Sequence, residues 1–420
     1  MKHEPYAYTK KSDFLKDLSR LRQGLPFLED CSVLNSTIEV DGKTIRNRLL
    51  AQPIEGRDAL ESGAPSGRTV RRYCQLAAGG SGVIWMESIS VNQEGKSVPR
   101  QMWLRRETVE EFSQMVSNIH ETKNDTLVVA QLTHSGRNSN PDGKKLAVCA
   151  FENPCLPQDN FRIVKDEELD MLREDYISAA LLAQQAGFDA VDIRACHGYL
   201  LNELFAAYDR GGKYGGSFEN RTRLLRDIIR GVKAQTDLTI AVRLNVTDGL
   251  PYPFGWGCEK KDVWVQDMTE PLKLVQELEQ LGVSVINVSA GIGACTPYMI
   301  RPFDRGNNLP DEHPLEGVER LLQSAKKIKE TVPSVCVVAS GFTWLRDFAP
   351  AVAAGGIAEG WFDLAGFGRQ WIANPGYANE ILQGSPLKMK CTTCGACMAI
   401  LKKGQPMRCV NNKGGQGCEL

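Results

Sequence analysis

The sequence has no apolar run long enough to cross a bilayer, which takes about 20 consecutive apolar residues. Its first residues, MKHEPYAYTKK, also lack the apolar stretch of a signal peptide. Neither a membrane-embedded nor a secreted protein is expected from these absences. A cytoplasmic location is expected instead.

Net charge is nearly absent as well. The 50 lysines and arginines are balanced by 51 aspartates and glutamates, which gives a formal net charge of −1. Such a balance provides no general attraction to nucleic acid or to an anionic membrane. Internal repeats and low-complexity tracts are also missing, and the hydrophobic share of 42% is typical of a globular protein.

A third absence concerns the dinucleotide-binding motif. No GxGxxG follows the first expected strand, which argues against a doubly wound fold. From residue 47 onward, strands alternate with helices, and this alternation predicts a parallel sheet. Eight strands are the number that closes a (β/α)8 TIM barrel. The expected strands are Arg48–Pro53, Val83–Ser90, Leu127–Leu132, Asp189–Arg194, Thr239–Leu244, Val285–Ser289, Cys336–Ser340 and Phe362–Gly366.

Apolar residues at helical spacing predict helices between these strands. The expected helices are Glu168–Ala186, Thr222–Ala234, Glu270–Leu281, Leu315–Thr331 and Thr343–Ala354. Residues 1–46 are expected to form an extension, with a helix at Ser12–Gln23 and a hairpin at Thr37–Ile45 that closes the barrel bottom. Residues 47–380 are expected to form the barrel, and residues 381–420 a cysteine-rich segment.

Catalytic side chains of such barrels lie at the carboxyl ends of the strands. The polar residues found there include Glu55, Glu87, Ser88, Gln131, Arg194, His197, Tyr199 and Arg243. The loops after the last two strands contain Ser340–Gly341 and Gly366–Arg369. Loops at these positions commonly bind phosphate through backbone N–H groups, and Arg369 adds a positive charge. Ordinary tight turns are the alternative explanation for these glycines.

Thirteen cysteines are many for a chain expected in a reducing compartment, where disulfides are rare. Most stand alone and are expected to be small core residues. Four of them form a C-x2-C-x2-C-x11-C pattern: Cys391, Cys394, Cys397 and Cys409. Clustered thiolates indicate a metal site, and this spacing favours a 4Fe–4S cluster with three ligands on one short loop. A zinc ion held by four cysteines is the alternative.

The stretch RACHGYLLNELFAAYDRGGKYGGSFENRTRLL (Arg194–Leu225), with NRLLAQP, QLTHSGR and ASGF…GFGR, resembles the Old Yellow Enzyme family. The resemblance runs from about Asn47 to Pro375. It implies a β/α barrel that holds FMN and mostly reduces activated C=C bonds.

The same resemblance implies roles for single residues. Tyr199 matches the active-site tyrosine of the family, and His197 matches the second of two substrate-orienting residues. Arg243 would stabilise the anionic reduced flavin near N1. The residues implied to contact FMN are Pro53, Glu55, Ser88, Gln131, Arg243, Gly341, Phe342, Gly368 and Arg369.

Two positions depart from the family pattern. Arg194 stands where the first orienting residue is usually histidine or asparagine, and Glu55 stands where some relatives have Thr or Cys. A covalent bond from FMN to a cysteine is therefore not expected there. Arg194 is either a substrate contact or a structural cation paired with Glu55 or Glu87, since a buried charge needs a partner.

The cysteine pattern resembles one branch of the family, the 2,4-dienoyl-CoA reductases and trimethylamine dehydrogenases, which carry a 4Fe–4S cluster directly after the barrel. Its x2, x2 start resembles the dehydrogenases, and its x11 gap resembles the reductases. Those relatives continue into flavin and nicotinamide domains, whereas this sequence stops at Leu420. We therefore expect electrons from NAD(P)H or from a carrier protein similar to a flavodoxin, a ferredoxin or a reductase.

The expected function is reduction of an activated double bond in an enone, an enoate or a similar small molecule. Hydride would pass from N5 of FMN to the β-carbon, Arg194 and His197 would polarise the carbonyl, and Tyr199 would protonate the α-carbon. One alternative is an oxidative amine dehydrogenase or demethylase that sends electrons out through the cluster. Another is a zinc-stabilised barrel that acts as a binding module. A homo-oligomer is compatible with the sequence.

Overall fold

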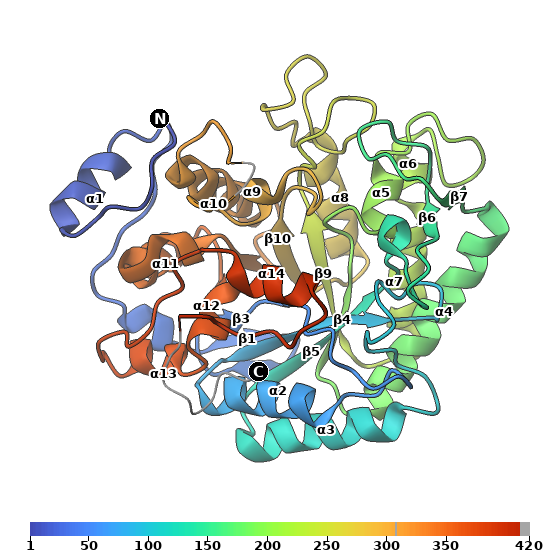
Figure 1. The fold of residues 1–420 in the computed structure, drawn as a ribbon, viewed down its shortest axis with the longest axis horizontal. Coiled ribbons are helices and arrows are strands. Elements are labelled where there is room, and N and C mark those ends of the chain that lie inside the picture. Colours follow the sequence, from blue (N-terminus) through green and yellow to red (C-terminus); the bar gives the residue numbers. More distant parts are fainter. Residues whose placement is uncertain (307–308, 412–420) are drawn as a thin grey trace.

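Eight parallel strands close into a barrel in the order β10-β11-β12-β3-β4-β5-β8-β9 (Figure 1). A computed structural model describes residues 1–306 and 309–411 of the chain. The predicted (β/α)8 fold is confirmed, and every expected strand overlaps an observed one. The strands are β3 (Leu49–Ala51), β4 (Val83–Ser90), β5 (Leu127–Thr133), β8 (Ala190–Ile193), β9 (Thr239–Asn245), β10 (Val285–Ser289), β11 (Cys336–Ala339) and β12 (Leu364–Phe367).

The barrel strands are buried on both faces, which explains why they appear in the sequence as apolar runs. Every residue of β4 and β9 is buried. Parallel strands covered by helices need no polar outer face, so the alternating pattern of a half-exposed sheet does not develop. The ring closes where Leu49 of β3 pairs with Ala365 of β12.

Helices surround the barrel and bury one face each against it (Figure 1). The longer ones are α2 (Gly67–Ala78), α3 (Val109–Thr122), α4 (Asp166–Gln185), α7 (Arg223–Gln235), α8 (Thr269–Gln280), α10 (Pro314–Thr331) and α11 (Ala349–Ala358). Helices α2 and α3 were not among the expected helices. The shorter ones near the barrel mouth are α5 (Leu200–Phe205), α6 (Phe218–Arg221), α9 (Pro297–Ile300) and α12 (Arg369–Ala373).

One expected helix is wrong in its bounds. In place of a helix over 343–354, a 3-10 segment, η3 (Phe342–Phe348), is followed by α11. Arg346 has a left-handed φ of 51°, which a continuous helix does not allow. Pro350 then occupies the first turn of α11, where its missing N–H costs nothing.

The predicted hairpin is present beneath the barrel. Strands β1 (Ile38–Val40) and β2 (Lys43–Ile45) pair antiparallel around a turn in which Asp41 and Gly42 have φ of 52° and 74°. Two positive φ values at Asp-Gly are typical of the tight turns that match strand twist. Val40 and Ile45 pack against the lower interior of the barrel, where Trp85 is buried.

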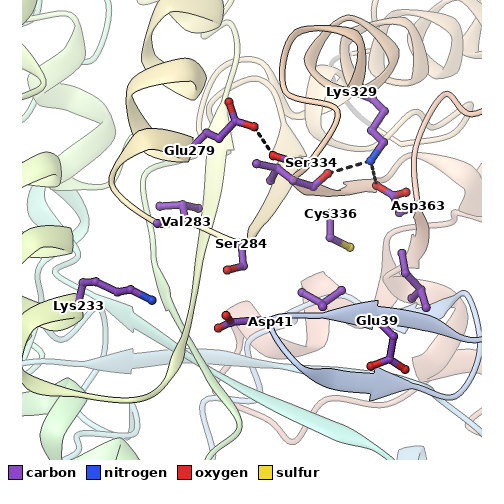
Figure 2. Close-up of a pocket in the computed structure, with 14 residues that line it drawn as sticks. Glu39, Asp41, Lys233, Glu279, Val283, Ser284, Lys329, Ser334, Cys336 and Asp363 are labelled. Atoms are coloured by element: carbon purple, nitrogen blue, oxygen red, sulfur yellow. Dashed lines mark hydrogen bonds and ion pairs between the residues drawn. The ribbon is translucent and has the colours of Figure 1, made fainter.

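A hollow of about 470 Å³ lies at this lower end, between the hairpin and the starts of β10 and β11 (Figure 2). Its charged lining is largely paired internally. Lys329 lies 2.8 Å from Asp363, and Ser334 donates to Glu279 (Figure 2). Because it lies at the amino ends of the strands, it is remote from the end at which barrels of this kind carry their chemistry.

The remaining elements lie at the chain ends and in the long loop before α4. They are α1 (Lys11–Leu18), η1 (Ser32–Asn35), η2 (Gly136–Asn138), β6 (Ala147–Cys149), β7 (Phe161–Ile163), α13 (Tyr377–Leu382) and α14 (Ala396–Lys402). Helix α1 ends five residues before the expected Gln23. Among the described residues, no helix has the length and apolar character needed to span a bilayer. Cys418 lies outside the described residues.

Candidate active site at the barrel mouth

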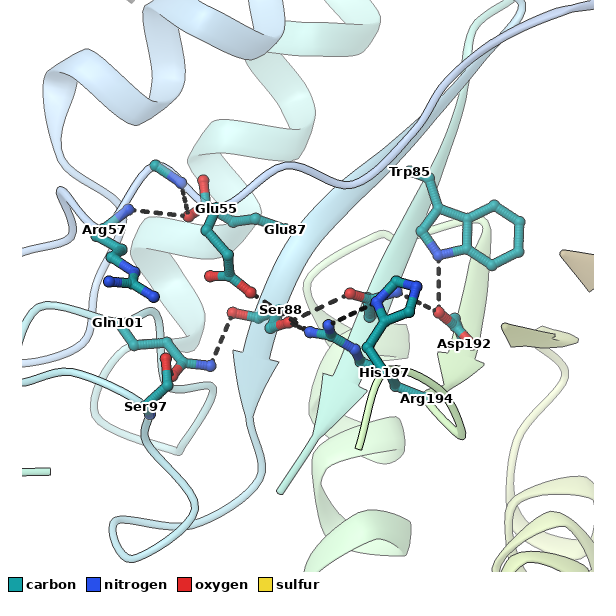
Figure 3. A network of polar contacts seen from close by, with 12 residues as sticks. Glu55, Arg57, Trp85, Glu87, Ser88, Ser97, Gln101, Asp192, Arg194 and His197 are labelled. Carbon is teal, nitrogen blue, oxygen red and sulfur yellow. Dashed lines mark hydrogen bonds and ion pairs between the residues drawn. The ribbon is translucent and has the colours of Figure 1, made fainter. Parts of the chain in front are cut away.

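Arg194 connects the predicted site residues at the carboxyl ends of β4 and β8 (Figure 3). Its Nη1 donates to Ser88 Oγ and lies 3.4 Å from Glu55 Oε1. The guanidinium carbon lies 3.6 Å from the ring centroid of Tyr199, so the cation stacks on the phenol. The pairing with Glu55 that the sequence allowed is therefore present.

Ser88 faces this group because β4 is irregular at that point. The register between β4 and β5 shifts between Trp85 and Ser88, and such bulges redirect side chains at barrel rims. Ser88 Oγ donates to Gln131 Oε1 at 3.2 Å. The two residues expected along the flavin are thus in direct contact with each other.

His197 has both ring nitrogens engaged. Its Nδ1 lies 3.4 Å from Arg194 Nη2, and its Nε2 lies 2.7 Å from Ser289 Oγ. Burial and the nearby arginines hold the pKa of His197 well below its usual value, so the ring is neutral. Arginine can only donate, which makes Nδ1 the acceptor and leaves the one N–H on Nε2, directed at Ser289.

Asp192 was missed in the sequence, although it is the acceptor beneath this site. Its carboxylate accepts from Trp85 Nε1 at 2.8 Å (Figure 3). It also accepts from Gln131 Nε2 at 2.7 Å and from the backbone N–H of Arg243 at 2.6 Å. Burial raises its pKa despite these bonds. Burying a carboxylate inside the apolar run AVDI costs free energy unless it has hydrogen-bond partners. The presence of Asp192 in that run was therefore the sequence signal for a buried polar network.

Arg243 has an unsatisfied donor at the mouth. Its side chain is 6% exposed, and its Nε has no hydrogen-bond partner among the described residues. Burial lowers the pKa of Arg243, which reflects the cost of holding the cation away from water. A bound group that offered hydrogen-bond acceptors to Arg243 would offset the free-energy cost of burying this cation.

Two arginines lie together at the opposite side of the mouth. Arg369 starts α12, and Arg301 follows α9 in the loop after β10. Burial and then the neighbouring Arg369 lower the pKa of Arg301 to about 10. Among the described residues neither arginine is paired with a carboxylate, which is the arrangement expected around a bound anion. Arg301 gave no signal in the sequence.

The glycines predicted near Arg369 are required for different structural reasons. Gly341 has φ of 105°, a conformation in which a side chain is strained, and an added Cβ would lie 2.8 Å from Leu321 Cδ1. Gly368 lies beside Ile54, with an added Cβ 3.5 Å from Ile54 Cδ1. Phe342 is fully buried directly after Gly341. Gly341 and Gly368 are half-buried, so both strand-end loops keep part of their backbone accessible.

A buried ion network fixes the loop that carries Glu55. Arg72 of α2 makes two bonds to Asp58, at 2.8 and 2.9 Å, and one to Glu87 Oε1 at 2.5 Å. Glu87 Oε2 accepts from the backbone N–H of Gly56 at 2.6 Å. Glu87 is thus engaged by Arg72, and the possible pairing of Arg194 with Glu87 is not found.

We expect Arg72→Met to destabilise the protein by about 3–5 kcal/mol, because it leaves two buried carboxylates without their cation. Urea denaturation followed by far-ultraviolet circular dichroism measures the change in unfolding free energy. Arg71→Met, on the exposed side of the same helix, is the control and should change it by about 0.5 kcal/mol or less. Equal losses in the two variants would contradict the assigned role.

The cysteine segment folds against the same side of the barrel. The backbone N–H of Cys391 donates to Gln370 Oε1 at 2.9 Å, next in sequence to Arg369. Thr393 has a left-handed φ of 55°, and its N–H lies 3.4 Å from Cys391 Sγ. Its hydroxyl donates to the buried Asp304 at 3.0 Å. That bond holds a conformation which a β-branched residue adopts only under strain.

The four predicted ligands all lie in the cysteine segment, but their side chains do not form a metal site. Cys397 lies in a small apolar cluster against which Ile54 and Cys409 pack, and burial raises the pKa of Cys391 and Cys397 while Arg369 opposes it. Within residues 1–306 and 309–411, no three His, Cys, Asp or Glu side chains are close enough to hold a metal ion. Four cysteine thiols and an N–H directed at Cys391 Sγ suit a thiolate-bound metal. The four thiols are nevertheless not arranged around a common centre.

A family model for the NADH:flavin oxidoreductase / NADH oxidase family matches residues 34–388. The chain belongs to this family. It is 28% identical over 381 residues to an NADH oxidase of Thermoanaerobacter brockii, covering 88% of the chain and 54% of that protein. The chain thus spans about half the length of that relative. It is 27% identical over 276 residues to an NADPH dehydrogenase of Halalkalibacterium halodurans, covering 64% and 76%.

Solved structures share the fold of this family member. An old yellow enzyme homologue from Zymomonas mobilis superposes with a TM-score of 0.66 at 24% identity, covering 86% of this chain and 96% of that one. A 2-naphthoyl-CoA reductase in complex with 2-naphthoyl-CoA gives a TM-score of 0.75 at 20% identity, covering 90% and 56%. At these identities the likeness supports the barrel fold alone.

Membership of the NADH:flavin oxidoreductase / NADH oxidase family confirms the predicted oxidoreductase class and supports FMN and NAD(P)H as cofactors. The mouth fits FMN in two respects. Arg243 offers an unpaired buried donor, and Arg301 with Arg369 offers an anion site at the other end. The iron–sulfur branch is not distinguished by this match.

Proposed function

We propose that the protein is an FMN-dependent ene-reductase that acts on an activated C=C bond and receives electrons through a 4Fe–4S cluster. The observation that carries the reductive direction is the pairing of Tyr199 with Arg194. A tyrosine phenol is protonated at neutral pH and can act as a proton donor, and burial raises the pKa of Tyr199 further. The guanidinium stacked on its ring would stabilise the phenolate left after donation.

Gln131 and Arg243 would hold the pyrimidine edge of FMN, and the bound flavin would supply hydride to the β-carbon of the substrate. Arg243 would oppose the negative charge of the reduced flavin, and Arg301 with Arg369 would hold the phosphate. Pro53, Glu55 and Ser88 would contact the flavin ring. Gly341, Phe342 and Gly368 shape the phosphate loops.

Substrate orientation is assigned to Arg194 and His197. The only N–H of neutral His197 is directed at Ser289, so the ring polarises a carbonyl after that contact is exchanged for the substrate oxygen. Arg194 keeps a buried Nε without a partner among the described residues. Donation from both groups would stabilise the charge that develops on the carbonyl oxygen.

The alternative, an oxidative amine dehydrogenase, is supported by the fold it shares with a 6-hydroxypseudooxynicotine amine oxidase from Pseudomonas geniculata N1, at a TM-score of 0.71 and 22% identity. The charges in the mouth argue against it. Arg194, which stacks on Tyr199 and lies beside His197, would repel a cationic amine. Glu55, the nearby carboxylate, is already shared with Arg194.

Two anaerobic half-reactions test the proposal. Photoreduced protein mixed with 2-cyclohexenone should regain the oxidised flavin spectrum in a single phase, whereas oxidised protein mixed with a tertiary amine should keep its flavin absorbance. Bleaching by the amine together with no reoxidation by the enone would contradict ene-reduction and favour the alternative. Mixing with NADH, NADPH or a reduced carrier then identifies the electron donor.

Cys391, Cys394, Cys397 and Cys409 are the proposed ligands of the cluster. The support is the four-thiol pattern, the N–H of Thr393 directed at Cys391 Sγ and the attachment of the loop to Gln370 beside Arg369. Ile54 packs against the apolar cluster that contains Cys397 and lies beside Gly368, so the cysteine segment is near a loop proposed to hold the FMN phosphate. Electrons entering there would have a short path to the flavin.

A further inference from the structure

A directional chain of hydrogen bonds joins the barrel strands β4, β5 and β8 through Ser88, Gln131 and Asp192. An arginine can only donate, so Ser88 Oγ accepts from Arg194 and donates its own O–H to Gln131 Oε1, at 3.2 Å. The other end of that amide, Gln131 Nε2, then donates to Asp192 Oδ2 at 2.7 Å. The chain runs from a group that never accepts to a carboxylate, so the orientation of Gln131 is fixed from both sides.

Asp192 is the anionic end of this chain. It also accepts from Trp85 Nε1 at 2.8 Å (Figure 3) and from the backbone N–H of Arg243 at 2.6 Å. All three neighbours donate, and a protonated carboxyl would need an acceptor that none of these N–H groups provides. The side chain is fully buried, and burial raises the pKa of Asp192 while the three N–H groups oppose the rise. These donors therefore compensate a buried negative charge.

Two buried donors beside Asp192 are left for a ligand. Gln131 Nε2 carries two N–H bonds, and Asp192 is its one acceptor among the described residues. In the same part of the chain, Arg243 Nε has no acceptor. Both side chains are buried, so water does not readily replace the missing acceptors. These donors belong to the two residues proposed to hold the pyrimidine edge of FMN, and Asp192 bonds both residues.

We propose that Asp192 is a positioning residue for FMN, which orients the amide of Gln131 and lowers the midpoint potential of the bound flavin. This inference rests on the FMN site of the proposed function, and neither the C=C substrate nor the cysteine segment enters it. The anionic reduced ring carries one more negative charge than the oxidised ring. A buried carboxylate that bonds Gln131 and Arg243 disfavours that added charge. Asp192 thus partly offsets Arg243 and makes the reduced flavin a stronger hydride donor.

The test is the midpoint potential of the FMN-loaded protein, measured by anaerobic spectroelectrochemical titration in Asp192→Asn and in a matched control. Asparagine keeps the shape of the side chain and removes its charge. Asp248→Asn is the control, because Asp248 is also buried and also accepts three N–H bonds. Its donors, at 2.8 to 3.1 Å, are Asn202, Asn245 and Trp256, none of which is proposed to contact FMN.

We expect Asp192→Asn to shift the ratio of reduced to oxidised flavin about tenfold toward the reduced form, which raises the midpoint potential by about 30 mV for a two-electron couple. The control should stay within about twofold of the parent ratio. If Asp192→Asn does not fold with FMN bound, Trp85→Phe takes its place. That change removes one donor and keeps the carboxylate charge, so the ratio should shift about twofold the opposite way.

An unchanged potential in Asp192→Asn, or in Trp85→Phe where it replaces that variant, overturns the role of Asp192. An equal shift in Asp248→Asn overturns it as well, because the effect would then belong to any buried carboxylate. A parent protein without bound flavin overturns the inference together with the proposed function. A flavin-loaded parent whose potential does not respond to these changes overturns the inference and leaves ene-reduction standing.

Discussion

Tyr199→Phe should slow reoxidation of the reduced flavin by 2-cyclohexenone by roughly 10²- to 10⁴-fold, the usual contribution of a positioned general acid. The substitution removes only the phenolic oxygen, so the ring stays available for stacking with Arg194. The protonated state that the raised pKa of Tyr199 secures is lost with the hydroxyl. Anaerobic stopped-flow of the oxidative half-reaction measures the rate directly.

The same variant contains its own control. Reoxidation by ferricyanide needs no proton on carbon, so its rate should be the same in the parent and in Tyr199→Phe. A variant that reduced the enone at the parent rate would show that Tyr199 only packs at the site. A variant that had lost both reactions would point to damaged FMN binding instead.

Cys394→Ser should remove iron and acid-labile sulfide from anaerobically purified protein while FMN stays bound, because one ligand of the proposed cluster is lost. Cys394 is exposed, so the change should cost little folding stability. The broad visible absorbance of the cluster and the iron content are the measurements. Reduction of the flavin by a one-electron carrier should fall to the background rate.

Cys295→Ser is the matched control, since Cys295 is also exposed but stands outside the cysteine segment. It should keep the full iron content. Zinc in place of iron in the parent protein would support the structural-zinc alternative and contradict the electron route. Iron retained by Cys394→Ser would exclude Cys394 as a ligand.

The sequence was most informative for the barrel strands. Because β4 and β9 are buried on both faces, their apolar runs appear without interruption, and the expected bounds lie within one residue of the observed ones. Helix α2 was missed because its sequence, GRTVRRYCQLAA, contains three arginines. One of them, Arg72, is buried by pairing with Asp58 and Glu87 from other elements, which no local pattern reveals.

The site was predictable wherever a motif fixed it. The pairing of Arg194 with Glu55 was among the expected alternatives, and its stacking on Tyr199 followed only from the fold. Asp192 and Arg301 were missed for a physical reason. Their roles depend on three-dimensional neighbours from other strands and loops, and an isolated acid in a strand or an arginine in a loop has many possible partners.

Helix α12 connects the anion side of the barrel mouth with the cysteine segment. Arg369 lies close enough to Arg301 to lower its pKa, and the next residue, Gln370, bonds the N–H of Cys391 and the carbonyl of Met389. If an anion that holds Arg369 also holds Gln370, it steadies the anchor of the cysteine loop, and by thermodynamic reciprocity ordering that loop strengthens anion binding by the same free energy. Assembly of either centre would thus prepare the protein to accept the other.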